Sequence, residues 1–287
     1  MRTSVPRFIC LVMAVFSLAG CSVMEQVSPR RHRNFAGDPK KPTLVFIHGV
    51  YHDSWAFESF KEPFLSNGYS CSLVDLRGHS VEPRTSSKSR IGYREYLEDV
   101  SGTLDEIEGG KVLIGHSLGG LLALSLSNRS DVLGHALIST PLPSAVRKKQ
   151  LGLVAEFPMK SMQFLATGNA AALYHDTRFT DRYFFSGYTS QARKSEAFTR
   201  ICNQHEPTQL FREIMRLEFK RLEPPVPSLI VLGSEDPTVT ADVGCQLQEL
   251  TGGSIVTIPR AGHDIMLEES SDIASNKILE WLRRQNW

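Results

Sequence analysis

Cysteine is scarce in this 287-residue chain, which has only five, at positions 10, 21, 71, 202 and 245. No two of them have the C-x-x-C spacing of a metal or redox site. Cys10 lies in the N-terminal apolar run described below and Cys21 directly follows it. The three cysteines that remain are an odd number, so at least one thiol stays unpaired. The sequence therefore predicts neither a disulfide framework nor a cysteine-ligated metal site.

An excess of charge of either sign is also missing. The 32 lysines and arginines balance 31 acidic residues, and the formal net charge is +1. Loss of residues 1–20 removes Arg2 and Arg7 and no acid, which changes this charge from +1 to −1. Without a long basic stripe the chain lacks the electrostatic footprint of a nucleic-acid-binding protein. We expect no nucleic-acid partner.

The N-terminal apolar run FICLVMAVFSLAG (residues 8–20) is too short and too early for a membrane-spanning helix. With two arginines before it, it has the layout of a secretory signal. Its end, Leu18-Ala19-Gly20-Cys21, resembles the lipobox of bacterial lipoproteins. The resemblance implies removal of residues 1–20, acylation of Cys21 and a cell-envelope location, which is the outer membrane if the source is Gram-negative. The alternative is an ordinary signal followed by a chance cysteine.

Residues 21–41 are polar and contain two prolines, Pro29 and Pro39, and the cluster Arg30, Arg31, His32 and Arg33. We interpret this segment as a lipidated tether. Its basic cluster either lies near anionic headgroups, where each charge contributes up to about 1 kcal/mol, or is simply part of a solvated linker. The linker interpretation is favoured.

Six short apolar runs alternate with longer helical patterns through residues 42–140 and 226–287. Continuous apolar runs of this length are typical of strands covered on both faces. Strand and helix in alternation predict an α/β fold with a mostly parallel, doubly wound sheet. The expected strands are TLVFIH (43–48), SCSLVD (70–75), KVLIGH (111–116), HALIST (135–140), SLIVLG (228–233) and SIVTIP (254–259).

Residues 141–225 interrupt this alternation with a helical pattern rich in Phe, Tyr and Met. We expect a helical cap inserted between two sheet strands, and not a separate domain, because the strand pattern resumes after it. The cap's large side chains form either an apolar acyl pocket or the cap's own core. They are Phe157, Met159, Met162, Phe164, Phe179, Tyr183, Phe184, Phe185 and Tyr188.

The segment VLIGHSLGG (112–120) places a serine between a predicted strand and a predicted helix. Gly115, Ser117 and Gly119 have the G-x-S-x-G spacing of a nucleophile elbow, where side chains at the flanking positions would collide with neighbouring elements. The backbone N–H of Leu118, at the helix start, would point toward an oxyanion. G-x-S-x-G alone is a weak motif, and the strand and helix on either side strengthen it.

A serine needs a general base, and His263 follows the last predicted strand, where the chain order serine, acid, histidine requires one. Asp236, after the strand ending at Gly233, is the candidate that orients this base, with Glu235 as the rival. His116 lies in the elbow, and we expect it to pack or form hydrogen bonds.

The segment VFIHGVYHDSW supplies a candidate for the second oxyanion donor. His48 and Gly49 end an early strand, and the backbone N–H of Val50 follows them. Two backbone donors aimed at developing charge contribute more than most single acid or base groups. The expected oxyanion hole is therefore formed by Val50 and Leu118.

Five motifs together carry a family resemblance: HGVYHDSW (48–55), DLRGHS (75–80), GHSLGG (115–120), GSEDP (233–237) and AGHD (261–264). Over roughly residues 43–284 the chain resembles α/β-hydrolase fold proteins of the lysophospholipase or carboxylesterase branch. Asp75, Arg77 and His79 are expected to brace their loop, in which Ser80 replaces the family's usual glycine. Ser117 distinguishes the chain from the dehalogenase and epoxide hydrolase branches, which use aspartate there.

These residues predict a serine hydrolase that cleaves carboxylic esters through Ser117, His263 and Asp236 and an acyl-enzyme. The expected substrate is a small ester or a lipid. No metal or organic cofactor is implied, and the oligomeric state is left open. The alternatives are a thioesterase, acyltransferase or amidase with the same triad, or a non-catalytic lipoprotein that binds a lipid or a partner.

Replacing Cys21 by alanine should abolish lipid attachment and move the protein from the membrane fraction to the soluble fraction, because the thiol is the group that would be acylated. Labelling of growing cells with palmitate measures lipid attachment, and fractionation of the same cells measures the location of the protein. Ser22→Ala, one residue further on, should change neither. A wild-type protein without an incorporated acyl chain would contradict the lipoprotein interpretation.

Overall fold

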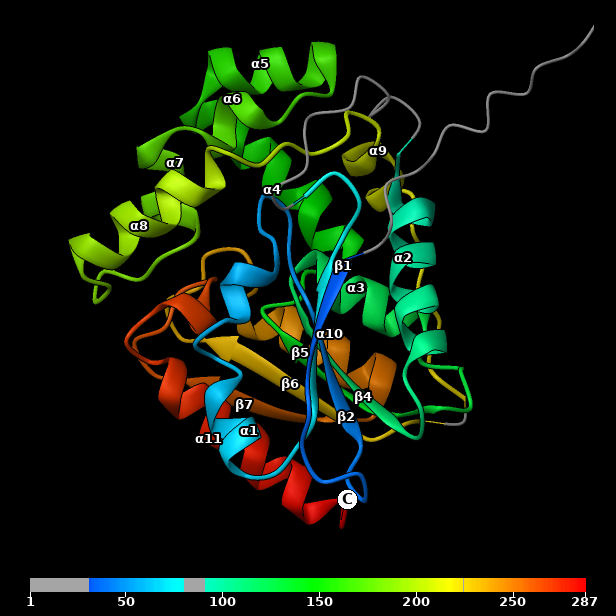
Figure 1. Cartoon of the computed structure of the whole chain (residues 1–287). Helices are drawn as coiled ribbons and strands as arrows, with labels where there is room; N and C mark the ends of the chain where they lie inside the picture. Colours follow the sequence, from blue (N-terminus) through cyan, green and yellow to red (C-terminus); the bar gives the residue numbers. More distant parts are fainter. Residues whose placement is uncertain (1–30, 80–90, 224) are drawn as a thin grey trace, which may run out of the picture.

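The structure is a computed structural model that describes residues 31–79, 91–223 and 225–287 (Figure 1). The predicted signal segment, Cys21 and the first part of the predicted tether lie outside the described residues. Ser80 of the DLRGHS motif lies outside them as well.

Seven strands form one sheet in the order β1-β3-β2-β4-β5-β6-β7. Strand β1 is antiparallel to β3, and every other neighbouring pair is parallel. The predicted α/β fold with a mostly parallel sheet is confirmed. The strands are β1 (Arg31–Phe35), β2 (Thr43–Ile47), β3 (Cys71–Asp75), β4 (Lys111–His116), β5 (Val132–Ile138), β6 (Ser228–Gly233) and β7 (Ser254–Ile258).

Strand β1 differs from the expectation, because residues 31–35 were assigned to the tether. They instead pair with β3 along their whole length, from Arg31 opposite Asp75 to Phe35 opposite Cys71. Arg33 donates a hydrogen bond of 2.7 Å to Ser54 Oγ, and Phe35 packs against the core. Charged side chains are common on edge strands, which they protect from further pairing. A polar edge strand of this kind has no apolar run to reveal it.

The helices of the core cover both faces of the sheet, as Figure 1 shows for α11 and α2. They are α1 (Glu62–Ser66), α2 (Tyr93–Glu106), α3 (Leu118–Ser125), α10 (Ala241–Thr251) and α11 (Ser271–Arg284), with short 3-10 turns at Ser54–Phe57 and Ile265–Leu267. Along β2, Leu44 and Phe46 enter one hydrophobic cluster, and Val45 and Ile47 enter the other. Successive side chains of a strand point to opposite faces, so a strand covered on both sides is apolar throughout.

Among the described residues, six helices lie between β5 and β6, and Figure 1 shows α5 to α8 gathered beyond one end of the sheet. They are α4 (Pro143–Glu156), α5 (Pro158–Thr167), α6 (Ala171–Tyr174), α7 (Thr177–Tyr183), α8 (Gln191–Ile201) and α9 (Leu210–Ile214). Their buried aromatic cluster includes Tyr51, which comes from the loop after β2. The cap therefore packs against the loop that follows β2.

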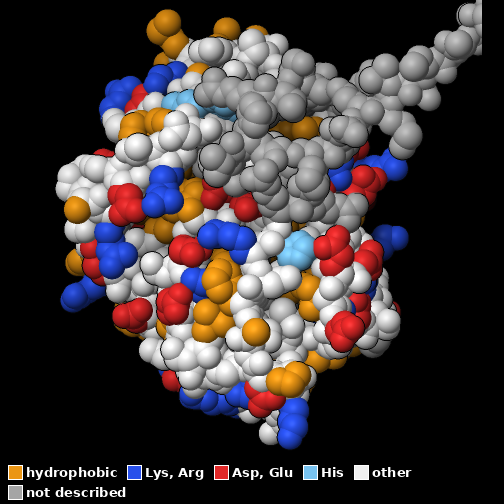
Figure 2. All heavy atoms as spheres, viewed as in Figure 1, with side chains coloured by type: hydrophobic (Ala, Val, Ile, Leu, Met, Phe, Trp, Pro, Cys, Tyr) orange, Lys and Arg blue, Asp and Glu red, His pale blue; other side chains and the backbone are white. Residues whose placement is uncertain are grey.

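Figure 2 shows acidic and basic side chains interspersed over the visible face of the molecule, without a continuous patch of one sign. This agrees with the near balance of charge in the sequence. Within the described ranges, no helix has both the length and the apolar character needed to cross a membrane.

Candidate active site

Ser117 lies between the end of β4 and the start of α3, in a conformation that non-glycine residues rarely adopt. Its φ angle is 51° and its ψ angle is −113°. The backbone N–H of Ser117 donates a 2.9 Å hydrogen bond to the carbonyl of Ile138 on β5. Strained residues of this kind persist only where the surroundings hold them, and they cluster at functional sites. The predicted elbow is therefore present as a sharp strand-to-helix turn.

The glycines around Ser117 are required by close backbone contacts. A Cβ atom on Gly115 would lie 2.4 Å from the carbonyl oxygen of Gly119, and one on Gly119 would lie 2.0 Å from that of Ile47. A Cβ atom on Gly120 would meet a side chain and not the backbone, at 1.9 Å from Thr140 Oγ1. The G-x-S-x-G spacing indicates Gly115 and Gly119 but not Gly120.

The structure brings Ser117, His263 and Asp236 into one chain of hydrogen bonds. His263 Nε2 lies 3.1 Å from Ser117 Oγ, and His263 Nδ1 lies 2.8 Å from Asp236 Oδ2. The other carboxylate oxygen of Asp236 accepts the backbone N–H groups of Thr238 and Val239 at 2.7 and 3.0 Å. These bonds fix the carboxylate so that it holds the imidazole in one orientation.

Glu235, the rival acid, is exposed, whereas Asp236 is buried beside His263. The backbone N–H of Glu235 donates to the carbonyl of Ala261, which keeps the two loops side by side. Of the two acids, only Asp236 contacts the imidazole.

Two opposing effects set the pKa of His263. Burial is the largest single effect and favours the neutral ring, whereas the charge and the hydrogen bond of Asp236 favour the protonated ring. Asp264 and Glu268 add to the attraction, and the pKa rises above its ordinary value of 6.5. The ring therefore holds a proton well once it has accepted one.

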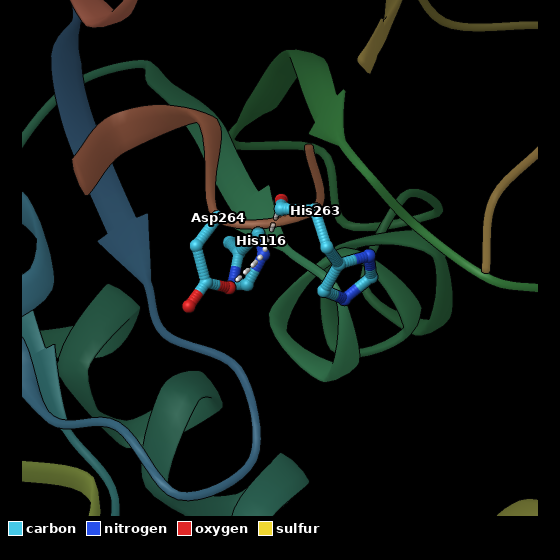
Figure 3. A group of neighbouring side chains, drawn as sticks. All are labelled: His116, His263 and Asp264. Carbon is cyan, nitrogen blue, oxygen red and sulfur yellow. Dashed lines mark hydrogen bonds and ion pairs between the residues drawn. The ribbon is translucent and has the colours of Figure 1, made fainter. Parts of the chain in front are cut away.

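His116 forms hydrogen bonds beside the elbow, as expected. Its Nε2 lies 3.1 Å from the main-chain carbonyl oxygen of His263 and 3.4 Å from Asp264 Oδ1. Burial, together with the nearby His263 and His52, lowers the pKa of His116 well below 6.5, so this ring stays neutral. Figure 3 shows the carbonyl of His263 facing His116 while the His263 ring points away.

Within the described part of the chain, His116, His263 and Asp264 form one group whose ligand-type atoms lie within 4.8 Å of one another. Both ring nitrogens of His263 already face Ser117 and Asp236. A metal held by this group would have to displace one of those contacts. We therefore interpret the group as part of the hydrogen-bond network.

Val50 and Leu118 line the same cavity as Ser117 and His263. Leu118 is the first residue of α3, where backbone N–H groups have no partner within the helix. His48 Nε2 accepts the N–H of Leu76 at 3.2 Å, so its Nδ1 carries the hydrogen and donates to the carbonyl of Gly49 at 2.9 Å. That carbonyl and the Val50 N–H belong to one peptide unit, and His48 therefore orients the predicted donor.

The DLRGHS motif braces its surroundings, as expected, over its described residues. Asp75 Oδ1 accepts the Ser54 N–H at 2.7 Å. The Arg77 guanidinium binds both carboxylate oxygens of Asp99 at 2.6 to 2.9 Å. His79 Nε2 lies 3.0 Å from Glu206 Oε1, which joins the motif to the cap.

The cavity above Ser117 has a volume of about 110 Å³ and a mostly apolar lining. Four of the nine predicted cap side chains line it, namely Phe164, Phe179, Tyr183 and Phe184. Phe157 and Phe185 belong to the buried cluster of the cap. Met159, Met162 and Tyr188 are exposed, at 85%, 66% and 59%, so neither expected role holds for these three. Met159 and Met162 lie on the outer face of α5, and Tyr188 lies in the loop between α7 and α8. Large apolar side chains occur on both faces of α5, so the sequence pattern does not show which face is buried.

Residues 44–275 match the model of the alpha/beta hydrolase family. The chain belongs to the alpha/beta hydrolase family.

Relatives of the chain in this family include hydrolases and lipases. The chain is 23% identical to the uncharacterised hydrolase YugF of Bacillus subtilis, over 91% of this chain and 100% of that protein. It is 23% identical to the mouse sn-1-specific diacylglycerol lipase ABHD11, over 85% of this chain and 82% of the lipase. The structure of MenH from S. aureus superimposes with a TM-score of 0.67 at 19% identity, covering 89% and 99% of the two chains, which shows the shared fold. The chain is accordingly an enzyme of the hydrolase class.

Three buried groups beside the triad are not indicated by the sequence motifs as site residues: His52, Glu206 and Asp264. His52 and Asp264 lie inside the quoted motifs HGVYHDSW and AGHD, so their positions were visible but not their contact. Glu206 lies in the cap and contacts Tyr51, 155 residues earlier in the chain. No local pattern indicates a pairing at that separation.

Replacing Gly119 by alanine should destabilise the protein by about 3 kcal/mol or more, because the obstacle is the backbone of β2 and not a movable side chain. The free energy of unfolding in urea measures the effect. Gly152→Ala in α4 is the matched control, since a Cβ atom there meets nothing within 4 Å. It should stabilise the protein by about 0.5–1 kcal/mol. Equal stability of the Gly119 variant and the wild type would contradict the packing argument.

Proposed function

We propose that the protein hydrolyses carboxylic esters, with Ser117 as nucleophile, His263 as general base and acid, and Asp236 as the group that orients His263. One observation carries the proposal: the hydrogen bonds from Asp236 through His263 to Ser117 Oγ end at an apolar cavity. A binding protein has no need of this arrangement, whereas acyl transfer to serine requires it.

In the first step, Ser117 Oγ attacks the ester carbonyl carbon while its proton passes to His263 Nε2. The Asp236 carboxylate stabilises the resulting imidazolium, in line with the raised pKa of His263. The N–H groups of Val50 and Leu118 are the proposed donors to the oxyanion of the tetrahedral intermediate. When the C–O bond breaks, His263 returns the proton to the departing alcohol.

In the second step, water attacks the acyl-enzyme carbonyl and gives its proton to His263 Nε2. Collapse of the second tetrahedral intermediate breaks the bond to Ser117 Oγ, which regains the proton and releases the carboxylic acid. Ser117 and His263 therefore end in the states in which they began.

The cavity supports an apolar acyl group as the part of the substrate that it receives. Its volume of about 110 Å³ is of the same order as the roughly 150 Å³ apolar cavity that accepts benzene. An acyl chain of short to medium length fits this space. The mouse relative whose name describes a diacylglycerol lipase supports an ester or lipid substrate for this chain as well.

We also propose that the enzyme acts at the cell envelope, held by a lipid on Cys21. The support is the sequence Leu18-Ala19-Gly20-Cys21 behind a signal-like apolar run. A small ester or a lipid at the membrane surface is the corresponding substrate.

Ser117→Ala should lower kcat for nitrophenyl ester hydrolysis by at least about 10³-fold, because a methyl group fits the turn but cannot attack the carbonyl. It should also abolish labelling by a fluorophosphonate probe, while circular dichroism and Tm stay close to wild type. Ser139→Ala, at another buried serine with positive φ, is the control that should keep the label. Labelling that persists in the Ser117 variant would assign the nucleophile to a different residue.

Within a series of nitrophenyl esters, kcat/KM should rise by up to about fourfold per added carbon and stop rising at roughly four to eight carbons, when the cavity is full. Phe164→Ala should move this optimum toward longer chains, because Phe164 lines the cavity. Met162→Ala, on the exposed face of the same helix, should leave the profile unchanged. A wild-type profile that is flat or falls from acetyl onward would reject the apolar acyl pocket.

A further inference from the structure

The peptide unit between Val50 and Tyr51, in the loop that carries the proposed oxyanion donor, is held at both of its polar atoms. His52 Nδ1 lies 2.7 Å from the carbonyl oxygen of Val50. The N–H of Tyr51, in the same peptide unit, donates a 2.7 Å hydrogen bond to Glu206 Oε1. Rotation of this peptide would break both bonds, so its plane is fixed.

His52 contacts an oxygen atom at each ring nitrogen. Its Nε2 lies 3.1 Å from Asp264 Oδ2, and its Nδ1 faces a carbonyl oxygen, which can only accept. Both nitrogens must therefore carry a hydrogen when Asp264 is ionised, which makes His52 an imidazolium. Burial favours the neutral ring, but the charge and hydrogen bond of Asp264 and the bond to Val50 raise the pKa of His52 above 6.5.

Glu206 is a carboxylate of the cap that is buried in the core. Besides the Tyr51 N–H, it binds His79 Nε2 at 3.0 Å and the hydroxyl of Tyr96 at 2.9 Å. Three donors from three segments hold it in place. A carboxylate with this many donors is a rigid support for the loop.

The conformation of Tyr51 shows why the loop needs such support. Its φ angle is 58°, in the left-handed region that a bulky side chain rarely adopts. Its ring is stacked on Tyr174 of the cap at a centroid distance of 4.3 Å. The loop is therefore held in a strained form by partners outside it.

We propose that His52, supported by Asp264, and Glu206 are positioning residues of the oxyanion loop: by fixing the Val50–Tyr51 peptide they keep the Val50 N–H directed at the reacting carbonyl. The proposal rests on the proposed function and goes beyond the motif that predicted Val50. His48 orients the peptide before Val50, and His52 and Glu206 fix the peptide after it. The two flanking peptides together determine where the Val50 N–H points.

Two substitutions of His52 by an amide residue test the contributions of its two ring nitrogens separately. In His52→Asn the amide nitrogen replaces Nδ1, so the donor to Val50 is kept and the contact with Asp264 is lost. In His52→Gln the amide nitrogen replaces Nε2, so the contact with Asp264 is kept and the donor to Val50 is lost. The two variants have the same neutral charge and differ in which bond survives.

His52→Gln should lower kcat/KM for a nitrophenyl ester by on the order of 10²-fold, the loss expected when one oxyanion donor is misplaced. KM should change by less than about threefold, because binding of the ester in its ground state does not depend on the Val50 N–H. The Ki of butylboronic acid, which forms a tetrahedral adduct with the serine, should rise by a similar factor of about 10². His52→Asn should lose no more than about tenfold in kcat/KM.

Two outcomes would overturn the proposal. One is a loss of less than threefold in His52→Gln. The other is an equal loss in both variants that follows their Tm values, which would assign His52 a purely structural role. Each variant is therefore compared with wild type by Tm in the same buffer.

A wild-type protein that neither hydrolyses esters nor reacts with a fluorophosphonate would reject the proposed function. In that case NMR of nitrogen-labelled histidine at pH 6.5 still decides whether the loop is held as proposed. Wild type should show two slowly exchanging ring N–H signals that are absent from both variants. Their absence from wild type would reject the imidazolium and with it the positioning role.

Discussion

A positive φ angle at Ser117 is the constraint on which the rest of the site depends. The chain must leave β4 and enter α3 within one residue, so the first turn of α3 lies directly against the end of β2. Gly119 permits that contact, and the bond from the Ser117 N–H to β5 holds the turn from the other side. Backbone strain of roughly 1–3 kcal/mol is tolerated there because neighbouring parallel strands hold both sides of the turn. The serine is thereby raised at the carboxyl end of the sheet, where sites in α/β folds form.

Four buried histidines lie in the loops at this end of the sheet, and their surroundings divide them into two pairs with opposite shifts of pKa. His48 is neutral because a backbone N–H donates to its ring, and burial lowers its pKa to about 3. His116 is neutral as well, because burial lowers its pKa and the nearby His263 and His52 rings lower it further. His52 and His263 each face a carboxylate, and the pKa of both is raised above 6.5. Burial and the neighbouring donors and acceptors, and not residue type, therefore decide which ring accepts a proton most readily.

The cap participates in the site as well as covering it. The carbonyl of Phe184 accepts the backbone N–H groups of His263 and Asp264 at 2.9 and 2.8 Å. Glu268, beyond the base, accepts the N–H of Ser186 in the cap and that of Gly262 in the base loop, each at 2.9 Å. Together with Glu206 these contacts connect the cap to both the proposed base, His263, and the loop that carries the proposed oxyanion donor, Val50. Changes in the cap are thus expected to affect the geometry of the reaction as well as the choice of substrate.

The sequence by itself determined six of the seven described strands, the elbow at Ser117 and the position of His263, because each depends on a few neighbouring residues: an apolar run, a glycine spacing, a turn after a strand. Only the tertiary structure decided that Asp236 and not Glu235 reaches the base, that residues 31–35 form an edge strand, and that Glu206 supports a loop 155 residues away. In the sequence, Glu235 and Asp236 are equivalent candidates, and only the direction of the backbone in the folded chain buries Asp236 and exposes Glu235. Contacts between distant segments depend on how whole elements pack, and no local pattern of residues records that packing.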